Sequence, residues 1–194
     1  PLRERADQVF DRINSYPGDG FRNHCLRLAD YAHLHAGHMG ISVDGDLVHA
    51  AAMLHDLGLL LRPEPGTDYV DRSWALAFRE LDVGQLEPHA QKVLEHSLRY
   101  NHSLRPLEGL TPEAEAFRRA VFTEHTLGLR RNGLDPEHVR EVGRSHPRHN
   151  FRRVLADFFW KTLVFEPRTI PGIFLPTRVE PSRLEADSER RIPA

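Results

Sequence analysis

The sequence predicts an all-α protein, with a single helical domain over residues 1–165 and an extended, proline-rich tail over residues 166–194. Apolar residues recur at helical spacing through most of the chain, almost no stretch alternates apolar and polar residues as a strand would, and Gly and Pro separate the periodic segments. A chain of 194 residues with 40% hydrophobic content can bury one core of its own. In the tail, helical patterns are broken by Pro171, Pro176, Pro181 and Pro193.

The helices can be placed in order along the chain. The first is predicted from Leu2 onward, because apolar residues share one face until Pro17 and Gly18 break the spacing. The second should span residues 21–36, with Gly37 past its end, and the third should begin near residue 42 and stop at Gly58. Further helices fit residues 71–81, 88–101, 112–127, 136–142 and 150–165, and three of these begin with Pro at the first helical position.

Composition limits the class of partner and the compartment. The 26 Lys and Arg residues nearly balance the 28 Asp and Glu residues, so no broad nucleic-acid-binding surface is expected. The single Cys25 cannot form an internal disulfide, which favours a reducing compartment. No apolar stretch approaches the roughly 20 residues of a membrane span, and the first residues are too charged for a signal peptide. A cytoplasmic protein without membrane contact is therefore expected.

The doublet His55-Asp56 is the most informative part of the chain, because it lies in an apolar helix just before that helix should stop. A carboxylate in such a place needs a cation or a hydrogen-bond network beside it. The helical spacing also turns His24 and His102 inward, whereas it turns His96 toward solvent. A single inward His is usually a core residue bonded to a carbonyl, but three together with a carboxylate are typical of a transition-metal site.

These residues resemble the HD superfamily of all-helical, metal-dependent phosphohydrolases, whose pattern is a His, a His-Asp doublet, further His residues in many branches and a late Asp. The resemblance covers roughly residues 20–130 and includes His24, the run Leu54-His55-Asp56-Leu57-Gly58 and the helix that ends in Asn101-His102. It implies an HD-type domain in which His24, His55 and Asp56 bind a divalent transition metal (Mn, Fe, Zn, Co or Ni). His102 would then be a second-metal ligand or a residue that contacts phosphate.

The sequence departs from this family in two places. Where the late Asp is expected the chain has Val121, which cannot bind a metal, so Glu124 is the candidate fourth ligand and His125 the other substitute; alternatively Glu124 keeps a structural ion pair and the metal site has decayed. The Lys that many members carry after the doublet is also missing. Arg62 is the first cation available in its place, and Arg72 is the further candidate for binding substrate.

If the site is intact, the resemblance implies hydrolysis of a nucleotide or another small phosphate ester by metal-activated water. Asp56 would hold the attacking water, and His102 would protonate the leaving oxygen or stabilise phosphate charge. Two alternatives stay open: an HD-fold hydratase or oxygenase acting on a small non-phosphate substrate, and a binding protein that kept the fold and lost the ion. The apolar residues of the tail should pack on the domain or on a neighbour, which makes a homodimer one candidate assembly.

Overall fold

The computed structural model describes residues 1–63, 66–167 and 169–180, and over these residues the protein is built of helices without strands. The α-helices are α1 (Leu2–Ile13), α2 (Gly20–Met39), α3 (Gly45–Leu54), α4 (Tyr69–Glu80), α5 (Pro88–Arg99), α6 (Pro112–His125), α7 (Pro136–Ser145), α8 (Phe151–Phe165) and α9 (Ile170–Phe174), with 3₁₀ turns η1 (Leu57–Leu60) and η2 (Val83–Gln85). The predicted all-α class and single helical domain are confirmed.

Side-chain caps explain where several helices begin. Asp44 caps α3 by accepting hydrogen bonds from the backbone N–H groups of Asp46 and Leu47. Thr111 caps α6 in the same way and is followed by Pro112 at the first helical position. The cap at Asp44 sets the start of α3 three residues later than the sequence pattern indicated.

Several helix ends differ from the prediction by two or three residues, and two of these differences bear on the site. Gly37 does not end α2, which continues for two more residues until Gly40 adopts a left-handed conformation with φ of 70°. The α-helical part of α3 ends at Leu54, so His55 and Asp56 lie in the turn that leads into η1. This turn frees the Asp56 side chain from the helical repeat and lets it point beside His55.

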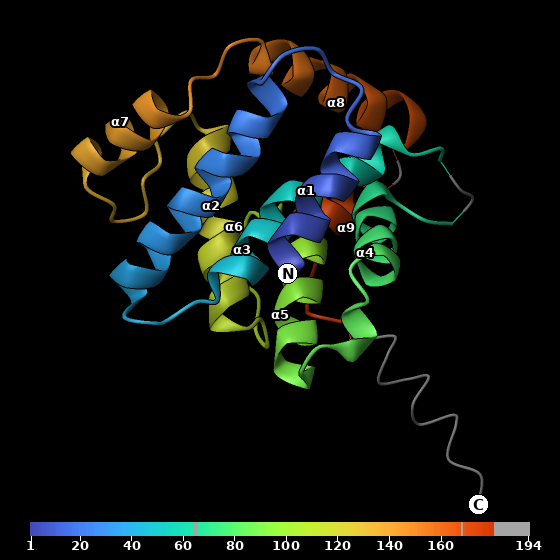
Figure 1. Ribbon diagram of the computed structural model, residues 1–194, viewed down its shortest axis with the longest axis horizontal. Helices are drawn as coiled ribbons and strands as arrows, with labels where there is room; N and C mark the ends of the chain where they lie inside the picture. The colour runs from blue at the N-terminus through green and yellow to red at the C-terminus, as the bar shows by residue number, and fades with distance from the viewer. Residues whose placement is uncertain (64–65, 168, 181–194) are drawn as a thin grey trace, which may run out of the picture.

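Helix α3 lies in the middle of the bundle, surrounded by α1, α2, α4 and α5 (Figure 1). Every residue from Leu47 to Leu54 is buried, which is the expected environment of a helix that is apolar on all sides. Helix α2 packs on α3 and also along α6. The C-terminal ends of α3 and α6 and the N-terminal half of α2 thereby bring the candidate site residues together.

The predicted tail contains a short helix rather than extended chain at residues 170–174. Its Ile173 is 2% exposed and packs against Tyr69 and Val70 of α4. The backbone N–H of Leu104 donates to the carbonyl of Phe174 at 3.0 Å, which fixes the segment beside the end of α5. The apolar residues of this part of the tail therefore pack on their own domain, while residues 181–194 lie outside the described residues.

None of the helices described here combines the length and the hydropathy that a bilayer span requires.

Candidate metal centre

Three buried side chains, one from α2 and two from the turn after α3, converge inside the bundle. His24 comes from α2, and His55 and Asp56 come from the turn after α3; their ligand atoms all lie within 4.8 Å of one another. The Nε2 atoms of His24 and His55 are 3.3 Å apart, and Asp56 Oδ2 lies 3.0 Å from His55 Nε2 and 4.0 Å from His24 Nε2. We call these three residues the metal centre.

The second nitrogen of each ring decides which atom faces the centre. His55 Nδ1 donates to the carbonyl of Ala52 at 2.8 Å, and in the tautomer with its proton on Nδ1 the lone pair is on Nε2. Burial lowers the pKa of His24 to about 4, so this ring is neutral near pH 7. Its Nδ1 faces the carboxylate of Glu124 at 3.5 Å, which places the single proton there. Both Nε2 lone pairs therefore point at the same small space as Asp56.

This donor set fits a divalent transition metal. Two imidazole nitrogens and a carboxylate oxygen are common ligands of Zn, Mn, Fe, Co and Ni. With metal–ligand bonds of about 2.1 Å, neighbouring ligands in tetrahedral or octahedral geometry lie about 3.0–3.5 Å apart. Two of the three distances, 3.3 and 3.0 Å, fall in that range, and the 4.0 Å separation requires a shift of about half an ångström. Without a cation, three lone-pair donors at this spacing would repel one another.

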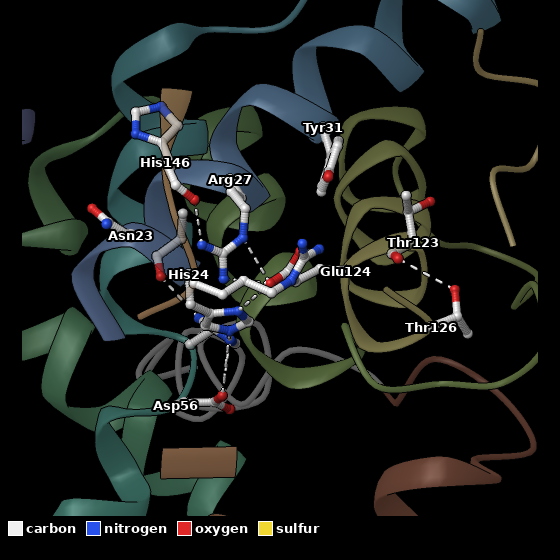
Figure 2. A network of polar contacts seen from close by, with 12 residues as sticks. Asn23, His24, Arg27, Tyr31, Asp56, Thr123, Glu124, Thr126 and His146 are labelled. Carbon is white, nitrogen blue, oxygen red and sulfur yellow. Dashed lines mark hydrogen bonds and ion pairs between the residues drawn. The ribbon is translucent and has the colours of Figure 1, made fainter. Parts of the chain in front are cut away.

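Glu124, predicted as a metal ligand, lies on the far side of the His24 ring from the metal centre (Figure 2). One of its carboxylate oxygens accepts from Arg27 Nε at 2.8 Å and from a terminal nitrogen of Arg27 at 2.5 Å, and the other accepts from Arg148 at 3.1 Å. Burial opposes its ionisation, but His24 and Arg27 outweigh burial and lower the pKa of Glu124 to about 2. In this arrangement the carboxylate orients the His24 ring, while Val121 is 1% exposed in the apolar core.

His102 joins the centre from the end of α5. Its Nε2 donates to Asp56 Oδ1 at 3.2 Å, on the oxygen that does not face the other two rings. Burial favours the neutral form of Asp56, but the nearby His55 and His102 rings outweigh burial and hold the pKa of Asp56 well below its usual range. The Nδ1 atom of His102 is buried without a hydrogen-bond partner among the described residues.

His125, the other substitute for the late Asp, stacks on one ring of the metal centre and on His102. Its ring is nearly parallel to those of His102 and His24, with centroid separations of 5.3 and 6.0 Å. Burial lowers the pKa of His125 to about 3, so the ring is neutral, and within the described part of the chain its Nε2 has no hydrogen-bond partner. The structure therefore brings His125 beside the centre but outside the group of three.

The prediction that His96 faces solvent is wrong. His96 is 4% exposed, and its Nδ1 accepts a hydrogen bond of 3.2 Å from the backbone N–H of Thr111. The segment that leads into α6 covers this face of α5, which helical spacing within α5 cannot indicate. His96 is thus a core residue with a backbone partner, the more common situation for an inward His.

A family model described as HD domain matches residues 21–140, which is more than half of the chain. The chain belongs to the HD domain family. No curated protein and no solved structure matches this HD domain. The match runs from the start of α2 to the middle of α7 and includes the whole metal centre, but it leaves out α1, α8 and α9.

The structure does not bring the two arginines predicted to bind substrate to the metal centre. Arg72 is buried, and its guanidinium donates to the carbonyls of Gly58 and Thr67 and pairs with Glu166. Arg62 is exposed and lines, with Arg72, a separate cavity of about 270 Å³. Arg72 therefore links α4 to η1 and to Glu166, the residue that follows α8.

A cavity of about 630 Å³ opens beside the metal centre of this HD domain. Asp56, His102 and His125 lie on its wall, and most of the remaining lining is apolar. Helix α8 supplies Leu155 and Phe159, and α9 supplies Phe174, whose ring lies 5.7 Å from that of His102. We call this space the apolar cavity.

Sequence reasoning missed two groups of residues around the site. Arg27 is completely buried and holds Glu124; its position three residues after His24, on the same side of α2, was the available signal. The cavity residues of α8 and α9 gave no such signal, because only the tertiary fold brings Leu155, Phe159 and Phe174 to the same cavity as Asp56.

Proposed function

We propose that this HD domain is a metal-dependent hydrolase that cleaves a small phosphate ester with metal-activated water. The observation that carries the proposal is the convergence of two imidazole Nε2 atoms and one carboxylate oxygen, with the Nδ1 atoms of both rings engaged elsewhere. A divalent ion held by this set would lower the pKa of a coordinated water from about 15.7 to about 7 and would polarise a phosphoryl oxygen.

The protein residues supply position and proton transfer. Asp56 directs Oδ2 at the two imidazole Nε2 atoms and accepts a hydrogen bond from His102 on Oδ1, so it connects His102 to the metal ligands. His102 lies on the wall of the apolar cavity with its Nδ1 not bonded to any described residue, which suits it to exchange a proton with a bound substrate. Glu124 and Arg27 hold the His24 ring in the tautomer that metal binding needs.

Elemental analysis combined with a turnover assay tests this proposal. Protein purified without added metal should contain a transition metal and should hydrolyse bis(p-nitrophenyl) phosphate after loading with manganese or zinc. His55→Ala and Asp56→Asn should lose both metal and turnover, whereas His89→Ala, which removes an exposed His on α5, should keep both. Equal and negligible metal in all four proteins would overturn the proposal.

A second candidate function is a hydratase or oxygenase acting on a non-phosphate substrate. The apolar lining of the cavity favours it, because a phosphate group usually requires cationic partners. Iron in the purified protein and turnover that requires dioxygen would identify an oxygenase, and water addition without dioxygen would identify a hydratase. The third candidate is a binding protein that has lost the ion, for which Val121 is the argument; in that case Asp56→Asn would leave ligand binding intact.

A further inference from the structure

The wall of the apolar cavity separates into a polar and an apolar part. Asp56, His102 and His125 form the polar part beside the metal centre, and Tyr69, Arg152 and Thr162 are the other lining residues with polar side-chain atoms. The apolar part is contributed by η1, the turn after α6, α8 and α9, through Leu59, Leu127, Leu155, Phe159, Ile170 and Phe174. A volume of about 630 Å³ lies within the range of small-molecule binding sites. One end of a bound molecule would thus meet the metal centre and the rest would meet hydrocarbon.

The apolar part of the wall lies largely outside the residues that match the family. The HD domain match ends at residue 140, whereas α8 begins at Phe151 and α9 ends at Phe174. Backbone and side-chain contacts fix these helices to the domain: Tyr69 N–H donates to Glu166 at 3.0 Å, and Arg72 pairs with the same carboxylate. The HD core thus carries the metal ligands, while the C-terminal helices of this chain shape the space in front of them.

Cations are scarce around this cavity. The arginines near the metal centre already have carboxylate partners, since the buried Arg27 and the half-buried Arg148 bind Glu124 and the buried Arg72 binds Glu166. Among the described lining residues the one cation is Arg152, whose side chain is exposed. A polyanionic substrate would therefore enter an apolar space without the bidentate arginine contacts that phosphate groups usually receive.

The charge of the metal centre sets what the reacting group can carry. Imidazoles that bind a metal are neutral and a carboxylate ligand is ionised, so a divalent ion held by His24, His55 and Asp56 would carry one net positive charge. A group with one negative charge, such as a phosphodiester, neutralises this charge, whereas a doubly charged phosphate monoester leaves an uncompensated negative charge in a poorly solvated place.

We propose that the substrate is an amphiphile, with a polar reacting group that carries a single negative charge and an apolar body that fills the cavity between η1, α8 and α9. This inference rests on the proposed hydrolase function and narrows it to substrates such as phosphodiesters of apolar alcohols, and away from polar nucleotides. Phe159 and Phe174 are the specificity-determining residues on the apolar side.

Binding of 1-anilinonaphthalene-8-sulfonate, a fluorescent monoanion with an apolar body, tests this inference without turnover. Zinc-loaded protein should bind the probe, and methane-, butane- and octanesulfonate should displace it with affinity that rises about fourfold for each added methylene. AMP should not displace it at concentrations at which butanesulfonate does. Affinity that does not change along the sulfonate series, or displacement by AMP alone, would overturn the inference.

Two adjacent residues of α8 provide matched variants. Phe159 and Trp160 are similarly exposed, at 69% and 61%, but only Phe159 lines the cavity. Phe159→Ser should weaken octanesulfonate binding about fivefold, and Trp160→Ser should leave it unchanged. Equal weakening by both would show that the probe sits on the outer face of α8, which contradicts the inference.

The outcomes also separate this inference from the proposed function. Chain-length-dependent binding in a protein that never turns over a phosphodiester would support the amphiphile site and count against the hydrolase. Turnover of bis(p-nitrophenyl) phosphate without chain-length dependence would support the hydrolase and remove the amphiphile site.

Discussion

Replacing Glu124 by Gln tests whether this carboxylate acts through the His24 ring. Gln keeps the size and the acceptor oxygen of Glu124 but removes its charge, which leaves the completely buried Arg27 without an ionic partner. Breaking a buried ion pair by removing one partner costs about 3–5 kcal/mol, and because Gln still accepts hydrogen bonds we expect about 3 kcal/mol here. A domain with a stability of about 5–15 kcal/mol should remain folded after this loss.

The effect on metal binding is separate from the effect on stability. Loss of the carboxylate that orients a metal-bound His weakens metal affinity by about 10–100-fold. Arg148→Gln provides the matched control, since Arg148 contacts the other oxygen of Glu124 at 3.1 Å and its side chain is 28% exposed. This control should lower the free energy of unfolding by less than about 1 kcal/mol and should leave metal affinity almost unchanged.

Two measurements check this prediction. Urea unfolding of the metal-free proteins gives the stability change, and zinc titration against a chromophoric chelator gives the affinity. A zinc affinity in Glu124→Gln equal to that of the wild type would contradict this prediction, because the His24 tautomer would then not depend on the carboxylate. Complete loss of binding in a folded variant would instead make Glu124 a direct ligand.

Three further predictions concern packing, pH and the cavity. Gly58→Ala should cost at least about 3 kcal/mol in urea unfolding, because its Cβ would lie 1.9 Å from the carbonyl oxygen of Tyr69, whereas Gly84→Ala, with 3.6 Å to its nearest neighbour, should change stability little. Burial lowers the pKa of His35 to about 4, so protonation favours the unfolded chain, and stability should fall by up to about 1.4 kcal/mol per pH unit from about pH 6.5 down to pH 4. His35→Gln should show a shallower fall across that window in metal-free urea titrations, and an unchanged slope would count against the assignment. Phe174→Ala should weaken octanesulfonate binding about fivefold while leaving zinc affinity intact, and a loss of zinc affinity would mean that this ring supports the metal centre instead.

The sequence was informative about the helices where local chemistry sets their limits. Pro88, Pro112 and Pro136 marked the starts of α5, α6 and α7, because a proline at the first helical position has no hydrogen bond to lose. The end of α2 was misjudged because two glycines lie within four residues, and only the backbone shows that Gly40 takes the left-handed conformation. Local patterns thus located these helices to within a few residues.

The sequence indicated which residues of the candidate site point inward, but not which of their atoms face one another. Helical spacing correctly placed His24 and His55 inside, and the turn after α3 put Asp56 beside them. Spacing also turned Glu124 inward, but it could not indicate which nitrogen of His24 the carboxylate would face. That choice depends on Arg27 and Arg148, whose positions are fixed only when α2, α6 and the segment before α8 pack together.

The face of a helix that is covered is likewise a tertiary property. His96 is buried because the segment before α6 crosses it. The short helix at residues 170–174 packs its Ile173 on Tyr69 and Val70 at the start of α4. Both features arise from contacts between parts of the chain that are distant in sequence.

The proposed hydrolase requires a cation bound between His24, His55 and Asp56. An anomalous-difference map from crystals soaked in manganese, recorded at a wavelength where manganese scatters anomalously, tests it. We predict a peak about 2.0–2.3 Å from the two Nε2 atoms and from Asp56 Oδ2. A map without a peak at this position, from crystals in which the three side chains are well ordered, would show that these residues do not bind a cation.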